Sequence, residues 1–157
     1  TVVTNLMNLA QADEAFFGQK DAQQVVVIRR FVADLNLNVH INMVPIVREE
    51  SGLARSSRNQ YLSAEEKEAA LILSRSLRKA ATAYESGETD VATLKQIVIA
   101  SLNTEPLARI DYVELYDFPG LNEVPRVTQA SLLAIAVKIG KTRLIDNVIL
   151  GKEAGEA

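Results

Sequence analysis

Apolar residues follow strand-like and helix-like patterns in turn along the first 62 residues. Residues 15–17 form a short apolar run (AFF) that stops at Gly18, which is typical of a strand. A long helix is predicted after Asp21, a candidate N-cap, and residues 39–43 alternate apolar and polar side chains as a second strand that Pro45 should end. The apolar face of the predicted helix comprises Val25, Ile28, Val32 and Leu35. This order of strand, helix and strand predicts an α/β arrangement with a parallel sheet.

A polar stretch then interrupts the pattern. Residues 48–61 read REESGLARSSRNQY, with one glycine, Gly52, near the middle. Such a composition is typical of a surface loop. We therefore predict a domain boundary after Leu62, with one domain over residues 1–62 and a second over residues 63–157.

Two helices are predicted after this boundary. Ser63 and Glu66 match a capping box, in which the hydroxyl and the carboxylate satisfy free amides at the helix start. The helix that they begin should cover about residues 64–86. A second helix should follow, capped by Thr89 or Asp90. The apolar face of this second helix comprises Val91, Leu94, Ile97, Val98 and Leu102.

The last third of the chain changes to an alternating pattern. Strands are predicted over residues 110–115, 131–139 and 143–150, with a turn at residues 118–120 and a tight hairpin at residues 140–142. Three antiparallel strands and two helices form a small α+β domain. The predicted fold class is therefore α/β, with a parallel-sheet part followed by this α+β part.

Composition narrows the function classes. A length of 157 residues is enough for one medium domain or two small ones. The apolar share of 48% is enough for a core and excludes a disordered chain. Lys+Arg 17 against Asp+Glu 20 gives a net charge of −3, which disfavours nucleic acid and acidic membranes as partners. The sequence has no cysteine, and its single histidine, His40, lies in an alternating strand, which disfavours a zinc site. No run of apolar residues approaches the ~20 of a membrane helix. We expect a cytoplasmic protein without a metal site of its own.

One candidate site follows the first predicted strand. Residues 18–24 read GQKDAQQ, a glycine turn between a strand and a helix start. In open α/β sheets, ligands bind outside the carboxyl ends of strands, where helix amides receive phosphates. Lys20 could neutralise a phosphate, and Asp21 could bind a ribose hydroxyl. A solvated lysine beside a capping aspartate is the structural alternative.

The polar loop is the second candidate site. Residues 52–59 read GLARSSRN and place Ser56 and Ser57 between Arg55 and Arg58. Hydroxyls and guanidinium groups on a glycine-hinged loop suit a phosphate chain, because both donate hydrogen bonds to oxyanions. An exposed linker between domains is the alternative interpretation.

Four sequence blocks together resemble one enzyme family. They are FFGQKDAQQ, RRFVADLNL, VPIVREESGLARSSRNQYLS and a distant TRLIDN, and they span nearly the whole chain. In this combination they resemble the pantoate–β-alanine ligases. The resemblance implies a nucleotidyltransferase-like enzyme that joins pantoate and ATP, with Mg²⁺, into pantoyl adenylate and pyrophosphate, after which the amine of β-alanine attacks the acyl carbon.

The resemblance also implies roles at the strand edge. By residue match, Gly18, Lys20 and Asp21 would bind ATP, with Lys20 toward the phosphates and Asp21 toward the ribose. Val47 would contact the adenine end of the nucleotide, and Gln24 would hydrogen-bond pantoate.

The polar loop would hold the triphosphate through Ser56, Ser57 and Arg58, because it resembles the KMSKS loop of class I aminoacyl-tRNA synthetases. Lys20 and these three loop residues are the expected catalytic group. No residue is assigned to a metal.

The sequence differs from the family pattern in three respects. The HxGH-type motif and the first strands of the family are not found in it, so we expect a C-terminal half that is inactive alone. An apolar helical spacing within residues 1–10 likewise suggests a start inside an element. Gln19 stands where glutamate is usual, and Arg55 where methionine or leucine is usual. A homodimer is expected of the full-length family, but only weakly of this chain.

Two other functions remain open at this point. One is a non-catalytic binding module that keeps the C-terminal domain and the polar loop but performs no chemistry. The other is a nucleotidyltransferase that activates a different carboxylate. The TRLIDN block has a structural alternative as well, since Arg143 and Asp146 could form simple cross-strand or turn contacts.

Overall fold

The computed structural model describes residues 5–6 and 9–151 and divides the chain into two compact units. Unit 1 is Thr1–Ile46 and unit 2 is Val47–Ala157. The polar stretch after Val47 therefore groups with the C-terminal part, although the sequence predicted a boundary after Leu62. Among the helices described, none is both long and apolar enough to cross a membrane.

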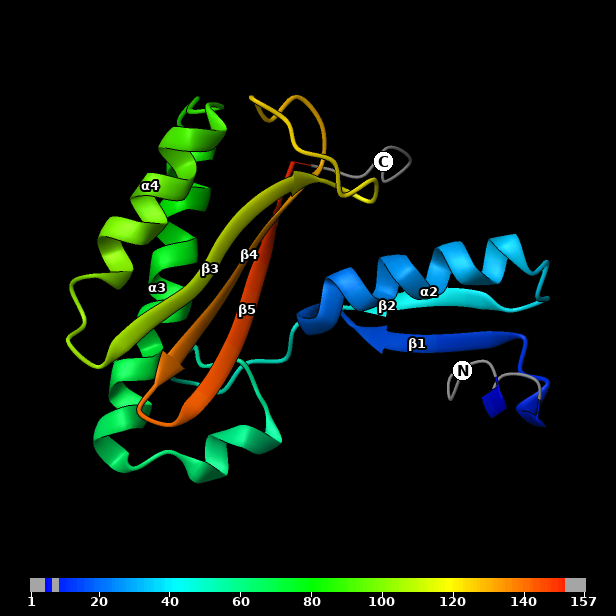
Figure 1. Cartoon of the computed structure of the whole chain (residues 1–157), viewed down its shortest axis with the longest axis horizontal. Helices are drawn as coiled ribbons and strands as arrows, with labels where there is room; N and C mark the ends of the chain where they lie inside the picture. The colour runs from blue at the N-terminus through cyan, green and yellow to red at the C-terminus, as the bar shows by residue number, and fades with distance from the viewer. Residues whose placement is uncertain (1–4, 7–8, 152–157) are drawn as a thin grey trace. The chain divides into compact units, whose positions relative to one another are not determined.

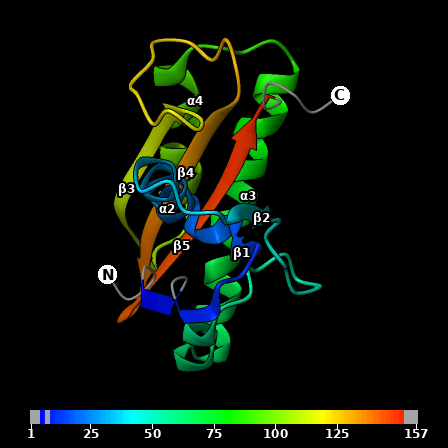
Figure 2. The ribbon, with the colours of Figure 1, turned by 90° about the vertical axis from the view of Figure 1, so that its right-hand side faces the viewer.

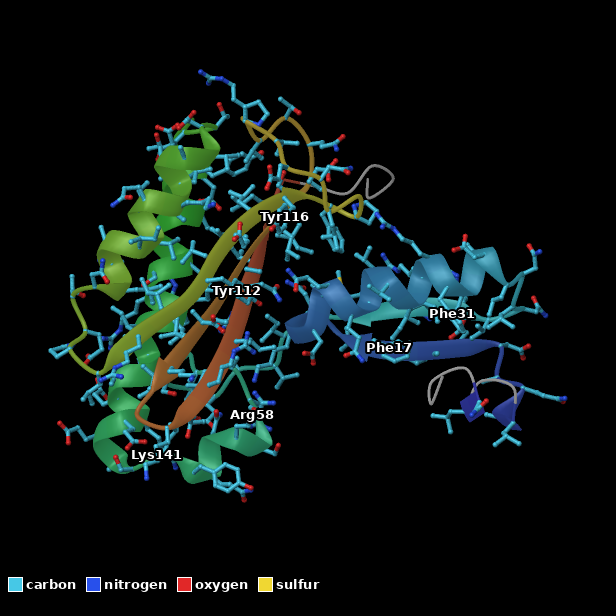
Figure 3. The ribbon with its side chains drawn as sticks, viewed as in Figure 1. Phe17, Phe31, Arg58, Tyr112, Tyr116 and Lys141 are labelled. Carbon is cyan, nitrogen blue, oxygen red and sulfur yellow. The ribbon has the colours of Figure 1, made fainter. Side chains whose placement is uncertain are left out.

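Unit 1 is a strand–helix–strand unit with a parallel sheet, as predicted. Its elements are β1 (Glu14–Gly18), the 3-10 turn η1 (Gln19–Asp21), α2 (Ala22–Asp34) and β2 (His40–Val44), drawn in blue to cyan in Figure 1. The two strands pair in parallel, with Gly18 opposite Val44. Helix α2 covers one face of the pair through a small core of Val25, Ile28, Val32 and Ile41. Phe17 of β1 and Phe31 of α2, labelled in Figure 3, pack against this core.

Two details of unit 1 differ from the predictions. Asp21 occupies the N-cap position of α2, but its side chain makes no capping hydrogen bond. Leu35 was predicted on the buried face and is 52% exposed, because the helix ends at Asp34. Of the apolar spacing predicted within residues 1–10, positions 1–4 and 7–8 lie outside the described residues, whereas 5–6 and 9–10 are helical.

Unit 2 is the predicted α+β domain. Its elements are η2 (Ser57–Tyr61), α3 (Ala64–Glu85), α4 (Val91–Leu102), β3 (Ala108–Asp117), β4 (Ser131–Ile139) and β5 (Thr142–Leu150). The strands form an antiparallel sheet in the order β3-β4-β5, and Figure 2 shows α3 and α4 together behind one face of it. Leucine, isoleucine and valine side chains from the sheet and both helices fill the core between them.

Capping explains where the two helices of unit 2 begin. The Ser63 hydroxyl accepts a hydrogen bond from the Glu66 amide at 3.1 Å, which is the hydroxyl half of the predicted capping box. The Asp90 carboxylate accepts from the amide of Thr93 at 2.9 Å and from its hydroxyl at 2.8 Å. Asp90 rather than Thr89 is therefore the cap of α4.

This cap predicts a pH dependence of stability. The hydrogen bond from the Thr93 amide, followed by the bond from the Thr93 hydroxyl, lowers the pKa of Asp90 below its ordinary value of 3.8. The contribution of Asp90 to stability is thus present above that value and is lost as the pH falls through the lowered pKa. Asp90→Asn should weaken the decline in unfolding free energy between about pH 5 and pH 2. All four tyrosines lie in unit 2, so urea unfolding followed by tyrosine fluorescence measures it.

Asp90→Ser is the matched variant, because serine caps a helix without titrating in this range. Both variants should show the same weaker pH dependence. An unchanged decline in either of them would contradict the role of Asp90.

Candidate functional site

The first candidate site lies at the carboxyl edge of the parallel strands in unit 1. Gly18 ends β1 and Val44 ends β2 at the same edge. The turn η1 then leads directly into α2, whose first amides have no partner within the helix. These amides and the helix dipole favour an anion at this edge.

Gly18 leaves this edge open because it has no side chain, although the backbone conformation at this position does not require glycine. Its φ of −71° and ψ of 137° are extended and accessible to any residue. A Cβ atom built on Gly18 meets no atom within 4 Å. The sequence suggested a glycine turn, whereas the chain turns in the three residues after Gly18. The missing side chain therefore exposes backbone at the position where a ligand would approach.

The polar residues of the edge come from the seven-residue segment that the sequence singled out. Lys20 in η1 is half-buried, Asp21 is exposed, and Gln24 is exposed on the first turn of α2. Because the Asp21 carboxylate does not cap the helix, the structural alternative of a capping aspartate lacks its hydrogen bond. Lys20, Asp21 and Gln24 thus place a cation, a carboxylate and an amide within two turns of the open edge.

The second candidate site is a small hairpin in unit 2 that leads into η2. Arg48 bridges to Ala54, and the amide of Arg55 donates to the carbonyl of Val47 at 2.9 Å. Gly52 turns the hairpin with a φ of +96°, and a Cβ atom there would lie 3.3 Å from the Ser74 hydroxyl. The backbone conformation favours glycine at this position, and a Cβ atom would be tight against Ser74.

The loop lies at the surface, as its polar composition predicts, but some of its side chains are buried. Leu53, Ala54 and Asn59 are buried. The Asn59 amide group donates to the carbonyl of Ala54 at 3.0 Å. Its oxygen is buried, and none of the described residues forms a hydrogen bond with it. These buried side chains fix the hairpin to unit 2 while leaving its end exposed.

The end of the loop presents the predicted phosphate-binding residues. The Ser56 hydroxyl accepts a hydrogen bond from the Arg58 amide at 3.2 Å and caps η2. Ser57 and Arg58 are exposed, and Ser56 is half-buried. Arg58, labelled in Figure 3, donates through Nη1 to the carbonyl of Arg143 at 3.2 Å. Two hydroxyls and one guanidinium group on a single turn can receive an oxyanion.

Each site is defined within its own unit. Gly18, Lys20, Asp21 and Gln24 belong to unit 1, whereas Ser56, Ser57 and Arg58 belong to unit 2. Val47 is the first residue of unit 2, is 57% exposed, and contributes its carbonyl to the base of the hairpin.

Two residues of the TRLIDN block form ion pairs: Arg143 pairs with a residue of another strand, as the structural alternative expected, whereas Asp146 pairs with a distant residue that the sequence did not identify. Arg143 pairs with the exposed Asp111 at 2.8 Å, and this hydrogen bond raises the pKa of Arg143 above its ordinary value. Asp146 pairs with Arg48 at 2.7 Å and is only 3% exposed. A signal was available: Asp146 is in phase with apolar Leu144 and Val148, so the alternating pattern places a carboxylate on the core side and predicts a buried partner.

The described residues contain no group of three or more His, Asp or Glu side chains that could hold a metal ion. The donors at both sites are instead cations, hydroxyls and backbone amides, and these are ligands for anions.

Comparison with known proteins reveals one family. The family model for pantoate-beta-alanine ligase matches residues 1–149. The pantothenate synthetase of Pelotomaculum thermopropionicum is 56% identical over 152 residues, which are 97% of this chain and 54% of that protein. The pantothenate synthetase of Clostridium acetobutylicum is 55% identical over 147 residues, 94% of this chain and 52% of that protein. The chain thus spans about half the length of these curated relatives.

Solved structures agree with the sequence comparisons. A pantothenate synthetase from Thermus thermophilus superimposes with a TM-score of 0.90 at 38% identity, over 94% of this chain and 53% of that one. A pantoate-beta-alanine ligase from Francisella tularensis, complexed with beta-gamma ATP and beta-alanine, superimposes with a TM-score of 0.66 at 27% identity, over 94% and 48% of the two chains. The predicted α/β fold class is confirmed.

Proposed function

Because this chain belongs to the pantoate-beta-alanine ligase family, we propose that it supplies the nucleotide-binding edge and the triphosphate loop of a pantothenate synthetase. The observation that supports this most strongly is that the family match includes both candidate sites. The ligase from Francisella tularensis was solved with beta-gamma ATP and beta-alanine, so a related fold accommodates a nucleotide and an amine substrate.

The proposed reaction has two steps. The pantoate carboxylate attacks the α-phosphorus of ATP, the bond to the β,γ-phosphates breaks, and pyrophosphate leaves. The amine of β-alanine then attacks the acyl carbon of pantoyl adenylate, and AMP leaves as pantothenate forms. The substrates supply both nucleophiles, so the protein has to position the reactants and stabilise the charge that develops on phosphoryl oxygens.

The proposed residue roles are those that the resemblance to the family implies. Lys20 would stabilise the phosphates and Asp21 would bind the ribose, beside the open backbone at Gly18. Gln24, an exposed amide, would hydrogen-bond pantoate. Val47 would contact the adenine.

On the other unit, Ser56, Ser57 and Arg58 would hold the β- and γ-phosphates. Lys20 and Arg58 would stabilise the transition state most. Fixed cations interact more strongly with the charge that develops on departing pyrophosphate than with the charge of bound ATP in the ground state.

Mg²⁺ is proposed as part of the nucleotide substrate. The described side chains do not form a carboxylate site for a resident metal, and we assign no step to one. Mg²⁺ commonly binds phosphate oxygens together with water, which fits entry as MgATP.

The experiment that tests the proposal is pantoate-dependent ATP–pyrophosphate exchange. We would compare this chain alone with a chimera in which it replaces the matching stretch of the Pelotomaculum thermopropionicum synthetase. We expect exchange by the chimera and none by the chain alone, since the chain spans half of its relatives. A chimera without exchange would reject the proposal and favour a non-catalytic binding module. Exchange with other carboxylates but not with pantoate would favour a different nucleotidyltransferase.

The open edge at Gly18 gives a separate prediction. Gly18→Ala should leave the fold intact, because its φ and ψ suit alanine and no atom lies within 4 Å of the new Cβ. Such a substitution commonly changes stability by less than about 1 kcal/mol. In the chimera it should raise the KM for ATP, because the methyl group would fill the space where the nucleotide approaches. Exchange kinetics at varied ATP concentration measure this effect.

Ala12→Gly serves as a control for the loss or gain of a single methyl group at an exposed position. An unchanged KM for ATP in Gly18→Ala would place the nucleotide elsewhere.

A further inference from the structure

Strand β5 contacts the polar loop of residues 48–61 near both of its ends. Near the start of the loop, Arg48 Nη1 lies 2.7 Å from Asp146 Oδ2 and Nη2 lies 2.9 Å from Oδ1. This is the bidentate geometry, in which arginine binds a carboxylate most strongly through two hydrogen bonds. Near the end of the loop, Arg58 donates to the carbonyl of Arg143. Two residues of one strand, three positions apart, therefore hold a loop that is distant in sequence.

The Arg48–Asp146 pair is unlike an ordinary surface ion pair. The side chain of Asp146 is 2% exposed and that of Arg48 is 30% exposed. A buried carboxylate without a partner is strongly unfavourable, so Asp146 constrains where Arg48 can lie. The amide of Asn147 also donates to Asp146 Oδ1 at 2.8 Å, which fixes the carboxylate itself.

Arg48 connects Asp146 with the turn of the hairpin. Its Nη1 atom also donates to the carbonyl of Gly52 at 3.1 Å. The guanidinium group thus contacts β5 and the tip of the hairpin at once. Ser56 follows the hairpin directly. Contacts that fix the strand and the tip of the hairpin therefore determine the position from which the Ser56–Arg58 segment continues.

The neighbouring Arg143–Asp111 pair offers a contrast. Its side chains are 40% and 47% exposed, and exposed pairs of this kind contribute little to stability. The Asp111 carboxylate accepts from Nε of Arg143, on the sheet itself, rather than from a residue of the hairpin. It provides a matched control on the same sheet.

We propose that Arg48 and Asp146 are positioning residues, which hold the Ser56-Ser57-Arg58 loop in the conformation that receives the phosphate chain of ATP. The proposal rests on the function proposed above. Neither residue has to touch the nucleotide, because both act through the hairpin.

Hydrogen–deuterium exchange on the full chain tests the positioning directly. The hairpin amides of Gly52 and Arg55 donate to carbonyls at 2.9 Å in the intact hairpin. Asp146→Asn should accelerate exchange of these amides by about tenfold or more, because it removes the carboxylate charge and one of the two oxygens that accept from Arg48. Amides of β4 should exchange as before, and Asp111→Asn should leave the hairpin protected.

A double variant keeps the test decisive if Asp146→Asn does not fold. Replacing both partners, Arg48→Met with Asp146→Leu, leaves no unpaired buried charge, and such replacements commonly preserve stability. It should retain the protection of β4 while loosening the hairpin. Wild-type protection of the hairpin in this variant would overturn the proposal.

Kinetics in the chimera separate positioning from a merely structural role. The KM for ATP should rise about tenfold in the double variant, with a smaller change in kcat, because the loop binds phosphates less well before chemistry begins. Arg48→Lys, which keeps the charge but not the bidentate geometry, should fall between. A loosened hairpin with an unchanged KM for ATP would also overturn the proposal. If the wild-type chimera shows no exchange, the proposed function fails, and protection of the hairpin alone decides this inference.

Discussion

Lys20→Ala is expected to lower pantoate-dependent ATP–pyrophosphate exchange in the chimera by about 10²–10³-fold, the usual cost of removing one preorganised charge-stabilising group. Lys20 lies half-buried in η1, directly before the first turn of α2, the end of the helix that favours anions. Negative charge grows on the phosphoryl oxygens as pyrophosphate departs, and a fixed cation stabilises that state selectively. The effect should therefore appear mainly in kcat.

Lys79→Ala is the control for this substitution. Lys79 is an exposed lysine on α3 in the other unit, and its removal should leave exchange unchanged. Lys20→Arg retains the charge with a different shape and should recover part of the activity. Exchange by Lys20→Ala within about threefold of the wild type would be far below the cost of a lost oxyanion donor and would contradict the assigned role.

Leu77→Ala is expected to lower the unfolding free energy of unit 2 by about 2–5 kcal/mol. Leu77 lies on α3, is 2% exposed and belongs to the core between the helices and the sheet. The cost combines the lost burial of the side chain with the cavity that it leaves, because the surrounding side chains relax only partly. Urea unfolding followed by tyrosine fluorescence measures this unit, since all four tyrosines belong to it.

Leu35→Ala provides the same chemical change without burial. Leu35 is 52% exposed and lies in unit 1, so the tyrosine-detected unfolding should stay as in the wild type. A Leu77→Ala variant less than about 1 kcal/mol below the wild type would show that the core can collapse around the site.

Local pattern was sufficient for most of the elements. The helix starts at Ser63 and Asp90 depend on hydroxyl or carboxylate groups within three residues of the amides that they bind. The strands of the second unit follow from alternation, which is a property of neighbouring residues. Leu35 was misplaced because helical periodicity continues in the sequence after the backbone has left the helix at Asp34.

The sequence determined which residues form the candidate sites, and the tertiary structure determined which contacts hold those residues in place. Residue types and their order identified Lys20, Asp21 and the Ser56-Ser57-Arg58 loop as groups suited to phosphates. Only the folded chain showed that Gly18 leaves open space, that Leu53, Ala54 and Asn59 of the polar loop are buried, and that Asp146 meets Arg48 from 98 residues away. Chemistry and local backbone preference reside in short segments, whereas burial and ion pairing depend on which distant segments the fold brings together.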